Sequence, residues 1–156
     1  MRALVVIDMQ KEFSDTAEPI IPKVVQQIKR AKKENYYIIL VKYAMSIYGP
    51  AIYKELLDAV RGYKKSKIIN KDNDDGSREV SRTFANQRNI SVDICGVNLS
   101  ACVSDTAYGL VKYKKFREVN IIVNACNDTP SGQRYANAEF NKYPHSKLNF
   151  VTETSC

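Results

Sequence analysis

The sequence has no long hydrophobic run and no closely spaced pair of cysteines. Charged residues recur throughout its 156 residues, so no stretch approaches the roughly 18 consecutive apolar residues that a membrane-spanning helix requires. The apolar run near the amino terminus stops at Asp8, which is too short for a secretory signal and typical of a buried strand. The four cysteines form neither a CxxC pair nor a disulfide framework. We therefore expect a cytoplasmic protein with free thiols and no membrane partner.

The chain carries an excess of positive charge, with 24 lysines and arginines against 17 aspartates and glutamates, or +7. The excess gathers in three clusters, Lys29–Lys33, Lys64–Lys67 and Lys112–Arg117. Each cluster is near the expected end of a helix, where cations complement the helix dipole. We favour this interpretation because no helix-turn-helix pattern or aromatic-interleaved RNA motif accompanies the charge, so nucleic acid is not the expected partner. A basic module that binds nucleic acid or protein remains the alternative.

Short β-rich apolar runs alternate with longer segments of helical periodicity, the pattern of repeated βα units. The expected strands are Ala3–Ile7, Tyr36–Lys42, Lys67–Asn70, Val92–Val97, Asn120–Asn124 and Leu148–Val151. The expected helices are Pro22–Lys33, Pro50–Val60, Arg78–Gln87, Ala101–Tyr113 and Gly132–Lys142. This alternation predicts a single α/β domain over residues 1–156, a doubly wound, open, mostly parallel six-stranded sheet with helices on both faces.

Chemically useful residues follow three of these strands. Asp8 follows the first strand, Lys71 follows the third, and Cys102 begins the helix after the fourth. Taken singly, each has an ordinary explanation, because aspartate caps turns, lysine is usually solvated and cysteine often fills a core. Ligands of open α/β sheets, however, sit at the carboxyl ends of strands. Together the three residues predict a cysteine-based catalytic group without histidine.

The sequence also suggests how these residues would act. The segment Gly96–Cys102 turns from a strand into a helix, whose free N–H groups favour a thiolate at Cys102. The N–H groups of Asn98 and Cys102 are candidate donors to a negatively charged oxygen. Asp8 would remove the thiol proton and return it to a leaving amine, while Lys71 would hold both anions.

These segments resemble the isochorismatase-like cysteine hydrolases, a family that includes nicotinamidases and N-carbamoyl amidohydrolases. Val5–Phe13 is similar to the family's opening strand, with aspartate followed two residues later by glutamine and then by phenylalanine. Ile94–Ala107 is similar to the nucleophile segment, a Gly-Val turn leading into Cys-Val and then Thr-Ala. Ile121–Asp128 resembles the fifth strand, although Asn124 stands where the family commonly has aspartate, and Cys126 is expected to be structural.

The resemblance implies a function for these residues. It implies that Asp8 is the catalytic acid/base and that the Val97–Asn98 peptide bond is cis, which would aim the Asn98 N–H at the oxyanion. Isochorismatases proper act on a vinyl ether and generally lack the nucleophilic cysteine, so Cys102 implies cleavage of a C–N bond through a thioester. The expected partner is a small amide or carbamoyl substrate, and the resemblance makes a homo-oligomer such as a dimer plausible.

The chain departs from the family pattern after the third strand. The Ser-Ala-Phe sequence that often follows the family's lysine is replaced by Asp72–Gly76, which weakens the assignment of Lys71 and alters one wall of the pocket. This acidic loop could select a cationic substrate, but an exposed turn is the favoured interpretation. It is not a calcium loop, because it lacks glycine at the required offset and the closing glutamate.

No cofactor or metal is expected. Metal-dependent nicotinamidases hold their metal with an aspartate and histidines after the second strand, whereas Lys42–Tyr48 contains no such ligands. The single histidine, His145, lies beside Pro144 and is expected in an exposed loop. The candidate pocket residues are Gln10, Phe13, Tyr43 and Tyr108.

Overall fold

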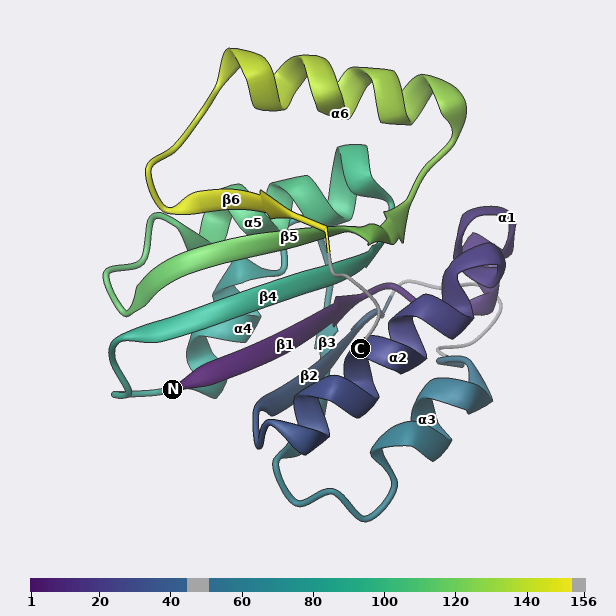
Figure 1. Ribbon diagram of the computed structural model, residues 1–156, viewed down its shortest axis with the longest axis vertical. Coiled ribbons are helices and arrows are strands. Elements are labelled where there is room, and N and C mark those ends of the chain that lie inside the picture. Colours follow the sequence, from purple (N-terminus) through teal and green to yellow (C-terminus); the bar gives the residue numbers. More distant parts are fainter. Residues whose placement is uncertain (45–50, 153–156) are drawn as a thin grey trace.

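A six-stranded sheet forms the centre of the protein in the computed structural model, which describes residues 1–44 and 51–152 (Figure 1). The strands lie in the order β3-β2-β1-β4-β5-β6, and every neighbouring pair is parallel. They are β1 (Arg2–Ile7), β2 (Tyr37–Tyr43), β3 (Ser66–Lys71), β4 (Ile90–Val97), β5 (Phe116–Asn127) and β6 (Leu148–Val151). The open parallel sheet expected from the alternating pattern is therefore confirmed.

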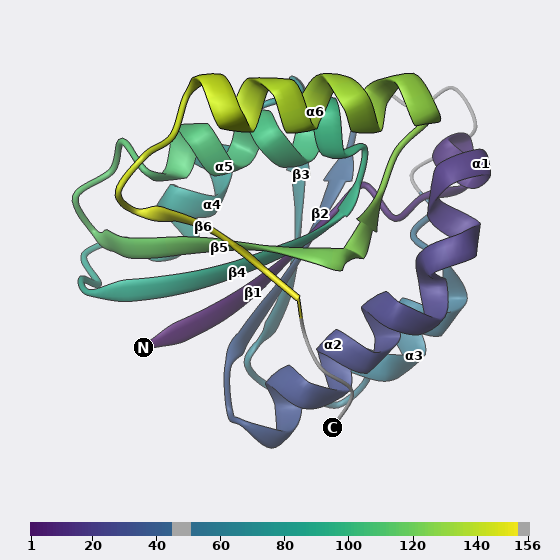
Figure 2. The same cartoon turned by 45° about the horizontal axis from the view of Figure 1, so that its top comes forward.

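Helices cover both faces of this sheet. The helices are α1 (Ser14–Ala17), α2 (Ile21–Lys33), α3 (Lys54–Val60), α4 (Ser77–Thr83), α5 (Ser104–Leu110) and α6 (Pro130–Lys142). Figure 2 shows α2 and α3 on one face and α4, α5 and α6 on the other. The expected helix at Pro50–Val60 begins only at Lys54, and its first residue, Pro50, lies outside the described residues. No described helix combines the length and the apolar character needed to cross a membrane.

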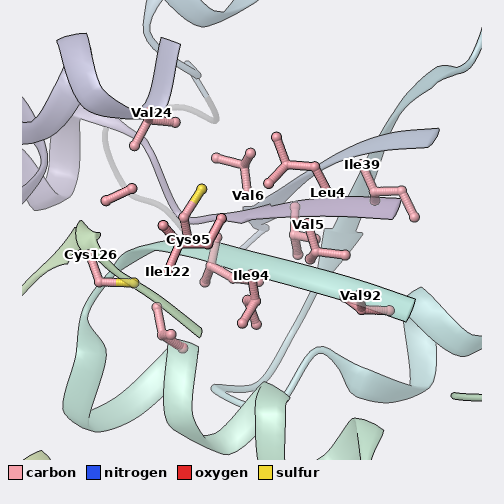
Figure 3. Close-up of a cluster of buried hydrophobic side chains, with 14 of the residues drawn as sticks. Leu4, Val5, Val6, Val24, Ile39, Val92, Ile94, Cys95, Ile122 and Cys126 are labelled. Atoms are coloured by element: carbon pink, nitrogen blue, oxygen red, sulfur yellow. The ribbon is translucent and has the colours of Figure 1, made fainter. Parts of the chain in front are cut away.

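The core is built on the central strands. All residues of β4 are buried, and so are all residues of β1 except Arg2, because both faces of these strands are covered. Figure 3 shows aliphatic side chains of β1 and β4 packed with Val24 of α2 and Ile122 of β5. Each buried aliphatic side chain contributes roughly 1.5–3 kcal/mol, so the central strands are fixed firmly. The edge strands are less covered, and Ile68 of β3 and Phe150 of β6 are exposed.

The basic clusters only partly follow the helix-dipole interpretation. The last turn of α2 contains Arg30, Lys32 and Lys33, as expected. The last turns of α3 and α5 contain no basic residue. The other two clusters lie beyond those helices, in connecting turns and strand starts, where the Nζ of Lys115 donates to the carbonyl oxygens of Ser81 and Ala85. For these two clusters the helix-dipole interpretation is wrong, because α3 ends at Val60, before the first lysine of its cluster, and α5 ends at Leu110, earlier than its periodicity suggested.

The strand order determines where a site can form. The chain runs outward from β1 to β2 and β3 on one side, then returns to place β4 against the other edge of β1. The segments that follow β1 and β4 therefore lead to opposite faces of the sheet. The carboxyl ends of these two strands form the topological switch point, where open α/β sheets bind ligands.

Candidate active site

Asp8 is the first residue after β1 and lies at the centre of this switch point. Its backbone φ of 52° is in the left-handed region, which aspartate tolerates better than most residues. Its N–H donates to the carbonyl oxygen of Val41 at 3.0 Å, which joins it to the neighbouring strand. The side chain is fully buried. The turn thus presents a carboxylate inward, at the carboxyl end of the sheet.

Lys71, the last residue of β3, brings its ammonium to this carboxylate. Its Nζ lies 3.1 Å from Oδ2 of Asp8, and both side chains have no solvent exposure. Burial opposes ionisation of Lys71, but the negative charges of Asp8 and Cys102 outweigh it, and the pKa of Lys71 is raised. Burial also raises the pKa of Asp8, while Lys71 and the thiol of Cys102 act in the opposite direction. The aromatic ring of Tyr43 covers the ammonium, with Nζ 4.9 Å from the ring centroid.

Cys102 reaches the same point from the loop after β4. It lies in a single π-helical turn, Leu99–Val103, that precedes α5, a form of helix found often at functional sites. Its side chain is almost fully buried and within hydrogen-bonding reach of Asp8 and Lys71. The structure therefore brings the carboxylate, the ammonium and the thiol together.

The expectation that the resting Cys102 would be a thiolate is wrong. Burial raises the pKa of the thiol well above its ordinary value, and the carboxylates of Asp8 and Asp74 add to the effect, whereas Lys71 lowers it. The short π-helical turn does not overcome these contributions. The thiol is consequently protonated at rest, and Asp8 is the buried carboxylate beside it.

The turn that leads to Cys102 is fixed by close packing of β4 on β1. The Val97–Asn98 peptide bond is cis, the place at which the resemblance put it. Gly96 has a φ of 119°, and a Cβ at this position would lie 2.1 Å from the carbonyl oxygen of Ile7. Only glycine permits this approach, which explains the glycine of the Gly-Val turn.

Hydrogen bonds from other elements hold the same turn, and no sequence pattern indicated them. The hydroxyl of Thr16 donates to the side-chain oxygen of Asn98 at 2.7 Å. The side-chain amide of Asn127 donates to the carbonyl oxygen of Thr16 at 2.9 Å. On the other side, the N–H of Ser100 donates to Oδ2 of Asp128 at 2.7 Å. These bonds keep the backbone before Cys102 in one position.

The acidic loop after Lys71 folds over the site. The Nζ of Lys71 donates to the carbonyl oxygen of Asn73 at 2.9 Å, and the Gly76 N–H donates to the hydroxyl of Thr106 at 2.9 Å. The loop thereby places Oδ1 of Asp74 3.7 Å from Sγ of Cys102. Asp74 is a further carboxylate at the thiol, although an exposed turn was the favoured interpretation of its loop and selection of a cationic substrate the alternative.

The predicted pocket residues occupy different places. Gln10 is fully buried, and its side-chain amide both donates to and accepts from the backbone of Tyr43, at 3.3 and 2.7 Å, which is a structural arrangement. Tyr43 covers Lys71, and Phe13 is half-buried against the core. Tyr108 lies outside this group, in a 440 Å³ pocket between α5 and α6, and its hydroxyl donates to the carbonyl oxygen of Tyr143.

The remaining predictions concern metals and cysteines. Across residues 1–44 and 51–152, no three His, Cys, Asp or Glu side chains are grouped as metal ligands. His145 is exposed and accepts a hydrogen bond from the Lys147 N–H. Residues 45–48 of the segment examined for metal ligands, and Cys156, lie outside the described residues. Cys95 and Cys126 are free, buried thiols, and burial raises the pKa of each.

Comparison with known proteins adds a family and a set of similar folds. The model of the isochorismatase domain family matches residues 2–144. A nicotinamidase from Staphylococcus aureus is similar with a TM-score of 0.77 and 17% identity, over 98% of each chain. MAR1 ribonuclease from Caenorhabditis elegans has a TM-score of 0.78 and 18% identity over 97% of this chain and 76% of its own. A zinc complex of pyrazinamidase from Pyrococcus horikoshii has a TM-score of 0.73 and 20% identity over 97% and 99%. No curated protein matches in sequence.

Proposed function

Because the chain belongs to the isochorismatase domain family, we propose that it is a hydrolase that cleaves a C–N bond in a small amide or carbamoyl compound. Cys102 is the nucleophile, Asp8 the acid/base and Lys71 the electrostatic support. The observation that carries this proposal is the buried Asp8–Lys71 ion pair, at 3.1 Å, beside the Cys102 thiol. Nicotinamidase and pyrazinamidase, the names of two similar structures, indicate amide substrates for those proteins and support the same class here.

The first half of the reaction forms a thioester. Asp8 accepts the thiol proton as the sulfur of Cys102 attacks the substrate carbonyl carbon. The N–H groups of Asn98 and Cys102 donate to the oxygen that becomes negative, and the fixed turn keeps them in place. Asp8 then gives the proton to the departing nitrogen, so the C–N bond breaks and an amine or ammonia leaves.

The second half hydrolyses the thioester. With the amine gone, Asp8 is again a carboxylate and accepts a proton from the attacking water. The C–S bond breaks, the proton returns to sulfur, and a carboxylic or carbamic acid leaves. Lys71 stays protonated throughout, because Asp8 and Cys102 raise its pKa. Its charge stabilises whichever of its two neighbours is an anion.

A direct test is a screen of small amides and carbamoyl compounds with purified protein. We expect ammonia or amine release by the wild type and none by Cys102→Ala. A matched control is Cys95→Ala, which removes another buried thiol, in the core of β4, and should retain the activity. Rapid acid quenching and mass spectrometry should find the acyl group on the Cys102 peptide. Hydrolysis by the Cys102→Ala variant would contradict the mechanism.

A non-catalytic role in binding nucleic acid or protein is the second candidate. The net charge of +7 and the altered segment Asp72–Gly76 after Lys71 favour it. The carboxylate of Asp74 at the Cys102 sulfur opposes it at this site, since a phosphate there would be repelled. Salt-sensitive binding of nucleic acid that is unchanged in Cys102→Ala would support this candidate.

The cytoplasmic location and the homo-oligomeric state expected from the sequence remain predictions.

A further inference from the structure

Asp74 is the one residue of the acidic loop whose carboxylate reaches the nucleophile. Its Oδ1 lies 3.7 Å from Sγ of Cys102, and its side chain is on the solvent side of the site. The buried carboxylate of Asp8 also raises the pKa of this thiol. Two carboxylates therefore act on the sulfur, of which only Asp8 has a cation paired with it. In the described part of the chain, Asp74 takes part in no salt bridge.

The loop that carries Asp74 is held in place at both ends. At one end the Nζ of Lys71 donates to the carbonyl oxygen of Asn73. At the other, the hydroxyl of Thr106 accepts from the Gly76 N–H and contacts the carbonyl oxygen of Asp74 at 3.4 Å. A Cβ on Gly76 would lie 2.9 Å from Cδ of Lys71, so the loop packs directly on the lysine stem. The position of the Asp74 carboxylate is thus set by the site itself.

The acidic loop and the start of α5 carry exposed carboxylates, although the protein as a whole is positive. Asp105, one helical turn after Cys102, is also exposed. Burial raises the pKa of Asp105, and Asp74 and Asp75 raise it further, which places these carboxylates in one electrostatic environment. Lys71 acts in the opposite direction on the pKa of Asp105, but its ammonium is paired with Asp8 and not with Asp74. A substrate that enters here meets an uncompensated carboxylate next to the attacking sulfur.

We propose that Asp74 is a specificity-determining residue that selects amide or carbamoyl substrates carrying an ammonium, amidinium or guanidinium group near the scissile carbonyl. The inference rests on the proposed function for the reaction itself. A cation in the substrate would pair with Asp74 while the carbonyl lies over Cys102. It would also offset the negative charge that raises the thiol pKa, so binding would favour transfer of the proton to Asp8. Anionic substrates would be repelled by the same carboxylate.

The charge preference can be measured at the sulfur without any hydrolysis. Methanethiosulfonates carrying 2-aminoethyl or 2-sulfonatoethyl groups react by attack of the thiolate on sulfur, with formation of a mixed disulfide and departure of methanesulfinate. Their rate constants at the Cys102 peptide would be measured by mass spectrometry in the wild type, Asp74→Asn, Asp74→Glu and Asp72→Asn. We expect the cation-to-anion ratio to fall about tenfold in Asp74→Asn. It should be largely kept in Asp74→Glu and in Asp72→Asn, which removes a neighbouring exposed carboxylate.

Both reagents meet the same protein, so a general change in thiol reactivity or folding cancels in the ratio. A ratio unchanged in Asp74→Asn would overturn the proposal. An equal fall in Asp72→Asn would overturn it as well, since the loop charge as a whole and not Asp74 would then be responsible.

A matched pair of substrates separates this inference from the proposed function. The pair would be two N-carbamoyl compounds of equal length, one ending in a methyl and one in an ammonium group. We expect kcat/KM to favour the ammonium compound by about tenfold or more in the wild type, and the preference to disappear in Asp74→Asn. Hydrolysis without charge preference would overturn the inference and leave the proposed function intact. Failure to hydrolyse any compound, with the probe ratio behaving as expected, would overturn the proposed function and support the charge selection.

Discussion

The Nζ of Lys71 lies 3.1 Å from Oδ2 of Asp8, and neither side chain is exposed to solvent. Two charges taken out of water stabilise a fold only while both are present, because each compensates for the lost hydration of the other. The pair is therefore a poor source of net stability. Its position beside Cys102 supplies a better reason for its presence, since Lys71 acts against the rise in the pKa of Asp8 that burial causes.

The first prediction concerns the mutual dependence of these charges. Asp8→Asn and Lys71→Met should each lower the free energy of unfolding by about 3–5 kcal/mol, since each leaves one buried charge without a partner. The double variant Asp8→Asn/Lys71→Met should be destabilised by less than the sum of the two. Urea denaturation of the four proteins measures this coupling. Lys54→Met, which breaks an exposed pair with Asp58, should change stability little. Additive losses would contradict the pairing.

A second prediction concerns the protonation of Cys102. Burial and the carboxylates of Asp8 and Asp74 raise the pKa of this thiol, so a thiol and not a thiolate is present at neutral pH. Alkylation of the Cys102 peptide by iodoacetamide should be slow near neutral pH and rise about tenfold per pH unit without a plateau up to about pH 9. Asp8→Asn should speed alkylation at a given pH, because it removes a negative charge from the sulfur. A plateau near neutral pH would contradict the assignment, and Cys102→Ala supplies the blank.

The third prediction tests the close approach of β4 to β1. In Gly96→Ala the new Cβ would lie 2.1 Å from the carbonyl oxygen of Ile7, at a φ of 119° that alanine avoids. We expect a loss of more than about 3 kcal/mol in the free energy of unfolding, or failure to fold. Gly62→Ala is the matched control, because Gly62 has a φ of 74° but no atom within 4 Å of the added Cβ. Its cost should be only the backbone strain of about 1 kcal/mol. Equal thermal stability of the two variants would contradict the packing argument.

A fourth prediction concerns Thr16 as a positioning residue. Thr16→Val keeps the shape of the side chain but removes the donor to the Asn98 side chain. The turn before Cys102 should then move more freely, so kcat should fall about tenfold with KM little changed, because the Asn98 N–H would be less well aimed in the transition state. Thr83→Val is the control, since it removes a similar hydroxyl bond within α4. A variant with wild-type kcat would show that the cis turn needs no support from Thr16.

Much of the fold was predictable from periodicity. The helix α2 and the strands β1 and β4 have clear apolar patterns, and the structure gives them nearly the expected bounds. Residues 11–20 were not predicted, because their short turns depend on contacts such as that of Thr16 with Asn98, from a distant part of the chain. The π-helical turn at Leu99–Val103 was also missed, since five residues are too few for a period of 3.6 to be distinguished from a wider one.

The candidate site was predictable where backbone topology decides it. Asp8 and Lys71 end parallel strands of one sheet, and this alone placed them at the same edge. The protonation of Cys102 was not predictable, because a sequence shows where a helix begins but not how deeply its first residues are buried. The contact of Asp74 with the thiol was not predictable for a similar reason, although its loop had been considered as a possible selector of cationic substrates. The direction of its side chain depends on how Thr106 holds the loop, and no local pattern encodes that contact.

Asp8 directly follows β1 and Lys71 ends β3, with β2 between them. The ammonium that compensates the buried carboxylate is therefore supplied by an edge strand two positions away. A unit of β1, α2 and β2 alone would leave Asp8 without its counter-ion. The ion pair consequently exists only when β3 has docked, so its formation reports closure of this half of the sheet.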